Sequence, residues 1–567
     1  MGNACTDNLG RILAAIGKCS AQTSFEPVIG VNNGGLLLAL PALLANGLLD
    51  SLHTFDFQNR YYRIQDIFLV VAFMVLARAD NLNRLNDIAP GEWGCLIGLD
   101  RIPDKKTMRT KIDELAYGTN EENLENWIGI RAKQWIDSED ENVIGKFYLD
   151  GHIRTYFGKE KLPYRYVPRQ KLCMRGLTDY WVNDEVGNPF FVVTTPFVKG
   201  LIASLKDDII PKLLELVPKL TEAEWQSGKP RLIMIFDREG FSMKLFKLLW
   251  DDYRIACQTY NKYPKEDWPE AEFKTISEET IFGTITELKI AERTITPLQD
   301  FEIREIRYMS ESDHQVSIVT KDFYGKTHPV IIHMRARQSQ ENFFRYSRQE
   351  FNLDTLASYS KVDVDDTVEV VNPKFRQLEK TINSTRAKLS RRHLKRSESV
   401  LPDNATDKQQ KNYEKRQGDL TAEIEEFDNV LVAAKAEKRV TEHYIPIKDL
   451  PEDVKFRTLH GGRKKFIDII KMICYRAEVV MANLIVPELT LYDRDTARSI
   501  IKNIFQASAD IFPDYENKRL TVCLHHTNNR KTDIIVQFLM DQLNKLSAHS
   551  QALNWRFSIN LCHKKIP

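Results

Sequence analysis

The stretch Leu232-Ile233-Met234-Ile235-Phe236-Asp237 decides the fold, because five apolar residues run directly into a carboxylate. A short apolar run of this kind is typical of a strand that is buried on both faces of a sheet. The same design occurs earlier, where Phe147-Tyr148-Leu149 is followed by Asp150-Gly151-His152. Each stretch therefore predicts a buried strand that ends at an aspartate.

The segments around these two strands indicate an α/β fold. We predict further strands over 153–157, 190–195 and 255–259, and a helix over 205–220. Strands interleaved with helices favour an α/β or mixed sheet. If the two aspartate-bearing strands are adjacent and parallel, both carboxylates lie at one edge of that sheet, where a divalent metal would relieve their repulsion. The alternative is that each aspartate only caps the turn after its strand.

Residues 335–351 predict a helix that carries a third acid. One stripe of this helix, at positions i, i+4, i+8 and i+11, consists of Arg337, Glu341, Arg345 and Arg348. One carboxylate among three arginines suits a metal-binding acid flanked by cations that hold phosphates. The alternative is a stripe of ordinary surface ion pairs.

Composition limits the classes of protein to which the chain can belong. The 567 residues are 43% hydrophobic and 28% charged, as in globular proteins. A net charge of +1 excludes binding of nucleic acid through an overall positive field, although not through local basic surfaces. The 8 cysteines form no CxxC pair, which disfavours a zinc ribbon and favours reduced thiols. The apolar runs over 36–49 and 67–77 are too short or too interrupted to span a bilayer, and no signal peptide is evident.

The three acids and their surroundings resemble the DDE transposases of bacterial insertion sequences, which have an RNase H-like core of the retroviral integrase superfamily. More narrowly, the sequence resembles the branch that has a β-rich insertion between the second Asp and the Glu. The signature of that branch is Tyr, two residues, Arg, three residues, Glu, six residues and Lys. Here that register holds Met334, Arg337, Glu341 and Arg348, so the Arg and Glu match while Met replaces Tyr and Arg replaces Lys. The strand-end segments 148–152 and 236–242 also resemble those of the family.

The resemblance implies metal-dependent phosphodiester chemistry. Asp150, Asp237 and Glu341 would hold two Mg²⁺ ions, with Mn²⁺ as a substitute and Asp150 as the bridging ligand. Glu350 and Glu239 are rivals for the third position, but Glu341 fits the register. The implied reaction is cleavage of transposon ends followed by transfer of the 3′-hydroxyl into target DNA. An RNase H-like nuclease, or a decayed or domesticated copy that only binds DNA, is the alternative.

The same resemblance implies the partners and the location of the protein. The partners would be double-stranded DNA, namely the terminal inverted repeats and the target, and a second copy of the chain that forms a homodimer in the synaptic complex. Arg337, Arg345 and Arg348 would contact phosphates near the scissile bond. Without a membrane segment, we expect a cytoplasmic, nucleoid-associated protein.

Seven segments follow from this interpretation. They are a short extension (1–26), a helical N-terminal domain (27–140), the first part of the RNase H-like core (141–261), a β-rich insertion that ends in a strand at 329–333 (262–332), the second part of the core with the catalytic helix (333–371), a charged helical hairpin (372–450) and a helical and α/β C-terminal region (451–567). The first 26 residues are too short for a helix-turn-helix, so we expect either a shortened copy or end recognition within 60–115.

Four basic segments are further candidates for contact with DNA. Asp104 is expected to cap a helix that exposes Lys105, Lys106, Arg109 and Lys111, which is either a DNA-facing helix or an ordinary solvated one. The bases of 374–396 would either follow a DNA backbone or lie on a solvated hairpin. The stretch 159–171, with Tyr164 and Tyr166, predicts either a DNA groove or a hairpin with packed tyrosines. Residues 460–465 open a helix that could seat a phosphate.

Overall fold

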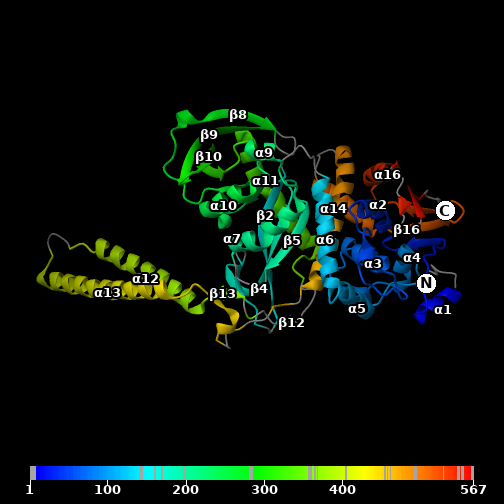
Figure 1. Ribbon diagram of the computed structural model, residues 1–567, viewed down its shortest axis with the longest axis horizontal. Coiled ribbons are helices and arrows are strands. Elements are labelled where there is room, and N and C mark those ends of the chain that lie inside the picture. Colours follow the sequence, from blue (N-terminus) through cyan, green and yellow to red (C-terminus); the bar gives the residue numbers. More distant parts are fainter. Residues whose placement is uncertain are drawn as a thin grey trace.

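Figure 1 shows a computed structural model of the chain. The structure describes residues 8–138, 145–158, 161–167, 170–195, 200–279, 285–355, 361–362, 366, 368–401, 405–451, 455, 458–459, 461–489, 494–527, 529–545, 549–550 and 555–562. Within these residues, none of the helices is long and apolar enough to cross a membrane.

A ten-stranded mixed sheet forms the centre of the molecule, in the order β3-β4-β2-β6-β7-β11-β10-β9-β8 with β5 paired to β4. The strands are β2 (Lys146–Thr155), β3 (Tyr164–Val167), β4 (Leu172–Asn183), β5 (Pro189–Thr195), β6 (Leu232–Phe236), β7 (Ile255–Tyr260), β8 (Lys274–Glu279), β9 (Ile285–Leu298), β10 (Phe301–Met309) and β11 (Gln315–Thr320). Strands β2, β6 and β7 are parallel, and β4 runs antiparallel to both β2 and β5. The predicted α/β class is confirmed at this level.

The β-rich segment extends this sheet and does not form a sheet of its own. β11 pairs antiparallel with β7, with Ile318 opposite Tyr260, and β10, β9 and β8 follow outward. Pairing with β11 removes the open edge that β7 would otherwise present. The strands expected as an inserted β-rich subdomain therefore continue the central sheet.

The strand expected at 329–333 is wrong, because these residues open the long helix α11 (Thr327–Phe351). The β-branched run favoured a strand, but Val330, Ile331 and Met334 are buried at helical spacing beneath the sheet. The backbone oxygen of Val330 also accepts a hydrogen bond of 2.8 Å from Nε2 of Gln258 on β7. Packing against the sheet therefore decides the conformation of this segment.

The helix expected over 205–220 is present as α7 (Leu201–Ser204), the π-helical turn η4 (Leu205–Ile209) and α8 (Ile210–Leu216). α9 (Glu222–Gln226), η5 (Arg238–Gly240) and α10 (Met243–Tyr253) complete the helices around β6.

Segments from the two ends of the chain pack together (Figure 1). The N-terminal region is mostly helical, as predicted, with α1 (Asn8–Ala15), α2 (Leu40–Ala45), α3 (Ile64–Leu76), α4 (Pro90–Ile97), α5 (Lys105–Ala116) and α6 (Asn120–Asp137). α14 (Gly462–Ile485) packs against α2, α3 and α5. A second sheet has the order β1-β16-β17-β19-β18, from β1 (Val28–Val31), β16 (Ala509–Asp514), β17 (Arg519–Leu524), β18 (His549–Ser550) and β19 (Trp555–Leu561). The pairing of β1 with β16 therefore joins the segments 27–140 and 451–567, which we predicted to be separate.

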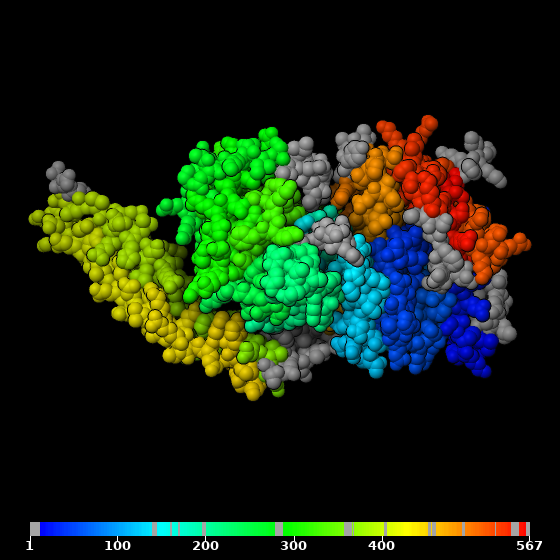
Figure 2. Space-filling view, turned by 45° about the horizontal axis from the view of Figure 1, so that its top comes forward, coloured from blue at the N-terminus to red at the C-terminus, as the bar shows by residue number. Residues whose placement is uncertain are grey.

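The charged helical hairpin is present as α12 (Pro373–Glu398) and α13 (Asp407–Val440), and Figures 1 and 2 show it projecting from the body. An apolar seam joins the two helices through Leu378, Ile382, Leu389, Ile424, Leu431 and Ala434. Spacings of three, four and seven residues in this seam are those of a coiled coil. At its base, β13 (Glu369–Val371) pairs with β14 (Tyr444–Pro446). Beyond it, α15 (Arg494–Gln506) and α16 (Arg530–Lys545) match the helices expected there.

Candidate active site

The two predicted aspartates lie side by side on adjacent strands, where the parallel pairing of β2 with β6 ends. Asp237 directly follows β6 as predicted, but the strand end predicted at Asp150 is wrong, because β2 continues to Thr155 in its pairing with β4. Leu149 of β2 is the parallel partner of Phe236 of β6, so Asp150 and Asp237 are the next residues along two adjacent strands. Neighbouring strands are about 4.8 Å apart. Asp150 Oδ1 accepts a 2.8 Å hydrogen bond from the amide of Gly151, and Asp237 Oδ1 accepts one of 2.6 Å from the amide of Arg238.

The charge of the third acid, Glu341, acts on Asp150 together with that of Asp237. Burial raises the pKa of Asp150 to about 6, while the Arg337 guanidinium and the Gly151 amide oppose this rise. The carboxylates of Asp237 and Glu341 both add to the rise in pKa. Three mutually repelling carboxylates, one of them costly to ionise, suit a divalent cation with oxygen ligands.

Glu341 lies on α11, and its two preceding neighbours fix that helix to the sheet. Nε2 of Gln340 donates to the backbone oxygens of Tyr148 (3.2 Å) and Trp181 (3.0 Å), and to Oδ1 of Asn183 (2.9 Å). Oγ of Ser339 donates to the backbone oxygen of Glu185 at 3.0 Å. Gln340 is 1% exposed, so this contact is a buried clamp directly before the third acid.

Arg337 approaches the acids from the same helix. Its Nη1 lies 3.9 Å from Oδ1 of Asp237. Its Nε is buried and has no hydrogen-bond partner among the residues that the structure describes. A cation one helical turn before Glu341 partly offsets the negative charge of the acids.

The two rival acids have different surroundings. Glu350 forms ion pairs of 2.8 Å with both Arg78 and Lys502, so its carboxylate is already neutralised at a different place on α11. Glu239, in η5, is exposed, and its charge acts on Arg165 and Tyr180. The charge of Glu341 acts on Asp150, Glu350 is engaged in ion pairs elsewhere, and the charges of Glu239 and Asp150 both act on Tyr180.

Comparison with known proteins shows the family of the chain. A family model described as "Transposase protein" matches residues 2–563. The chain belongs to this family. Its function is that of a DNA transposase. No curated protein matches the chain. Among solved structures, it is similar to a piggyBac transposase in a cryo-EM structure of its synaptic complex with hairpin DNA, at 12% identity over 82% of each chain and a TM-score of 0.31.

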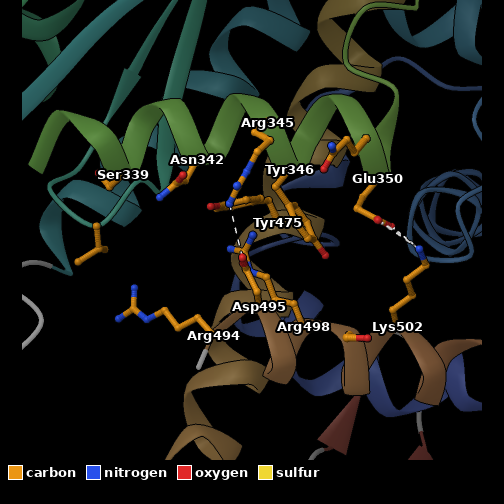
Figure 3. A pocket seen from close by; sticks show the side chains of 13 residues that line it. Ser339, Asn342, Arg345, Tyr346, Glu350, Tyr475, Arg494, Asp495, Arg498 and Lys502 are labelled. Atoms are coloured by element: carbon orange, nitrogen blue, oxygen red, sulfur yellow. Dashed lines mark hydrogen bonds and ion pairs between the residues drawn. The ribbon is translucent and has the colours of Figure 1, made fainter. Parts of the chain in front are cut away.

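One of the two remaining arginines of the α11 stripe, Arg345, lines a cavity in the transposase. Arg345 is 55% exposed and lies 3.5 Å from Asp495 of α15, and Nε of Arg348 donates to the backbone oxygen of Phe344 at 3.0 Å. Figure 3 shows the cavity, of about 420 Å³, between α11, α14 and α15. Arg498 lies there over the rings of Tyr346 (4.2 Å) and Tyr475 (4.3 Å). Arg345 therefore faces a basic, partly aromatic cavity.

The basic helix of the N-terminal region of the transposase forms as predicted, with one correction. Asp104 caps α5 by accepting a 2.7 Å hydrogen bond from the amide of Thr107. Lys106 is exposed and Lys105 is half-buried, while Arg109 is half-buried and donates to Asn83 at 2.8 Å. The expected exposure of Lys111 is wrong, because its Nζ donates to the backbone of Gln58 and to Glu114, and its side chain is buried over Phe57.

Two other basic segments have clear surroundings. Arg463 pairs with Asp113 at 2.6 Å, Lys464 with Asp468, and Lys465 with Glu125. The three bases at the start of α14, where a phosphate site was predicted, therefore form ion pairs within the protein. His460 lies outside the described residues. In the stretch 159–171, β3 pairs antiparallel with β4, and Tyr164 and Tyr166 are more than half exposed, with the Arg175 guanidinium 5.7 Å from the ring of Tyr164. Residues 159–160 and 168–169 lie outside the described part.

Sequence reasoning missed two residues beside the acids. His152 follows Asp150 by two residues on β2, bonds Asp354 through Nε2 and stacks on Phe344 at 5.3 Å. The alternation of a strand, which places residues i and i+2 on one face, was the available signal. Gln340 gave no signal, because a glutamine in a polar helical stretch is ordinarily solvated.

Proposed function

We propose that this transposase cleaves double-stranded DNA at the ends of its element and joins the freed 3′-hydroxyl to target DNA, with Asp150, Asp237 and Glu341 as the catalytic acids. The observation that carries the proposal is that Asp150 and Asp237 occupy neighbouring positions after a paired stretch of β2 and β6, next to Arg337, with the charge of Glu341 acting on Asp150. It is supported by the strand order β5-β4-β2-β6-β7, in which three antiparallel strands are followed by two parallel ones, as in an RNase H-like core. The alternation of Arg and Glu on α11 fits a DDE enzyme of the insertion-sequence type.

The three carboxylates would hold two Mg²⁺ ions, which supply an activated water or 3′-hydroxyl and stabilise the leaving oxygen. The protein side chains orient this site. Gln340 fixes the helix that carries Glu341, and Arg337 balances the charge of Asp237. Removal of either residue would misplace an acid without deleting it.

DNA would be held by cations around this site. Arg337, Arg345 and Arg348 would contact phosphates near the scissile bond, and Lys105, Lys106 and Arg109 of α5 would contact the duplex farther away. Lys111 is omitted because its amine is already satisfied within the protein. Two ends must be brought together, so the active species would be a homodimer.

The decisive experiment uses a labelled duplex that carries one element end, a target plasmid and the full-length transposase in Mg²⁺ or Mn²⁺. The wild-type protein should nick the duplex and give joined product. Asp237→Asn and Glu341→Gln should abolish both steps while still binding the duplex. Glu350→Gln is the matched control. It should retain cleavage, because the carboxylate of Glu350 is held in ion pairs with Arg78 and Lys502 and is not one of the proposed metal ligands.

Two outcomes would contradict the proposal. If Glu341→Gln cleaves like the wild type while Glu350→Gln does not, the third acid is misassigned. Cleavage without any joined product from a pre-cut end would favour the RNase H-like nuclease.

A further inference from the structure

A second group of potential metal ligands lies far from the catalytic acids, in the sheet formed by β1, β16, β17 and β19. Asp510 comes from β16, His525 follows β17, and Cys562 follows β19. One ligand atom from each of these side chains lies within 4.8 Å of the others. Figure 1 shows β16 beside the C-terminal end of the chain and the N-terminal helices.

Asp510 is the centre of this cluster. Its Oδ1 lies 2.7 Å from Nε2 of His525 and accepts a 2.8 Å hydrogen bond from the amide of Gly30 on β1. Its Oδ2 lies 3.5 Å from Sγ of Cys562. The thiol also lies 3.1 Å from the backbone oxygen of Cys523, the residue opposite Asp510 in the β16–β17 ladder.

The backbone holds these three side chains in place. The amide of His525 donates to the oxygen of Ser508 at 2.9 Å, and the amide of Cys562 donates to the oxygen of Leu524 at 2.9 Å. Each ligand therefore follows directly from a paired strand. Because the backbone of each ligand is held by strand pairing and not by a long loop, the cluster is largely formed before any ion binds.

The donor set selects a class of cation. A thiolate, an imidazole and a carboxylate together are the ligands that tetrahedral Zn²⁺ takes, whereas Mg²⁺ prefers oxygen alone. All three side chains are half-buried, so the site retains access for an ion and a water as fourth ligand. The catalytic acids, in contrast, offer only oxygen.

We propose that Asp510, His525 and Cys562 bind one zinc-class divalent cation, which links the N-terminal strand β1 to the C-terminal end of the sheet. Binding would replace the hydrogen bonds among the three side chains by bonds to the metal, and the thiol proton of Cys562 would be released to solvent. Because the ligands follow three different strands and Asp510 also holds Gly30, the ion would stabilise the packing of the two ends of the chain.

The test uses full-length protein, reduced and treated with chelator, then titrated with Co²⁺ and with Zn²⁺. Co²⁺ should give a thiolate-to-metal charge-transfer band that saturates at one equivalent, and Zn²⁺ should displace it. Asp510→Asn, His525→Ala and Cys562→Ser should each weaken Co²⁺ binding by at least tenfold. Zn²⁺ should raise the unfolding temperature of the wild type but not of Cys562→Ser.

Two matched controls keep the result specific. His526→Ala changes the neighbouring histidine, which pairs with Asp533 at 3.0 Å and belongs to no group of three potential metal ligands among the described residues, and should keep the band. Asp237→Asn should also keep the band, which separates this site from the catalytic one. Absence of a charge-transfer band in folded wild-type protein, or its equal loss in His526→Ala and His525→Ala, would overturn the proposal.

Discussion

Nη1 of Arg337 and Oδ1 of Asp237 lie 3.9 Å apart, so α11 brings a cation as well as an acid to the proposed catalytic site. The Arg337 guanidinium also opposes the rise in the pKa of Asp150. One helix thus contributes both to the negative charge that would attract metal and to its partial neutralisation.

Replacing Arg337 should slow the chemical step. Arg337→Gln removes a positioned cation from a site where charge develops, and such losses cost about 100-fold in rate. The measurement is single-turnover cleavage of an end-bearing duplex at saturating protein. Arg335→Gln is the control, because Arg335 lies on the same helix but is exposed, and its rate should stay near that of the wild type. Equal losses in both variants would show a general effect of charge on DNA binding.

Gln340 should act through position alone. Gln340→Ala leaves two backbone oxygens and the Asn183 side chain without their buried donor, which costs about 1–3 kcal/mol of unfolding free energy. Loosening the helix beside Glu341 should also slow cleavage by about 10–100-fold, as for other groups that orient ligands. Urea denaturation and cleavage at high Mg²⁺ measure the two effects. Gln338→Ala, at an exposed position of α11, should change neither.

Local chemistry explains what the sequence predicted well. Asp104 caps α5 through an amide three residues away, and the apolar run of β6 ends at Asp237 as expected. Contacts between distant segments explain the rest. Val330 is helical because it packs under the sheet, and Lys111 is buried because Glu114, Gln58 and Phe57 surround its amine. No local sequence pattern predicts that β1 pairs with β16, or that the side chain of Gln340 forms hydrogen bonds to the backbone of β2 and β4.

The buried pair of Arg154 and Asp179 should make stability depend on acid pH. Burial alone would raise the pKa of Asp179. The Arg154 guanidinium, the Lys464 ammonium and the hydroxyl of Thr194 together outweigh burial, so the pKa of Asp179 is lowered. A lowered pKa contributes stability above the unfolded value of about 4, and that contribution is lost as pH falls through the folded value.

Asp179→Asn should therefore destabilise the protein at pH 7 by about 3–5 kcal/mol, because it leaves Arg154 buried without its partner charge. It should also flatten the decline in stability between pH 5 and pH 3, measured by urea denaturation. Asp137→Asn breaks an exposed pair with Lys133 and should leave the pH dependence unchanged. A variant at Asp179 with the same acid profile as the wild type would contradict this assignment.

The projecting hairpin offers the sharpest test of a second DNA contact. Lys380, Arg391 and Lys395 are exposed on the side of α12 opposite the apolar seam, whereas Lys374, Arg392 and the α13 base Lys438 already pair with acids across the hairpin.

A DNA backbone along the exposed face of α12 would release counterions, and each lost phosphate contact lowers the salt slope of binding by about 0.9. Replacing the three exposed bases by alanine should therefore weaken duplex binding for every sequence alike and reduce the slope by about 2 to 3. The matched control replaces Lys408, Lys411 and Lys415, which are exposed on the side of α13 away from the apolar seam. If both triple variants lose the same affinity, the hairpin contributes only general charge; if neither does, it is a solvated coiled coil and DNA lies elsewhere.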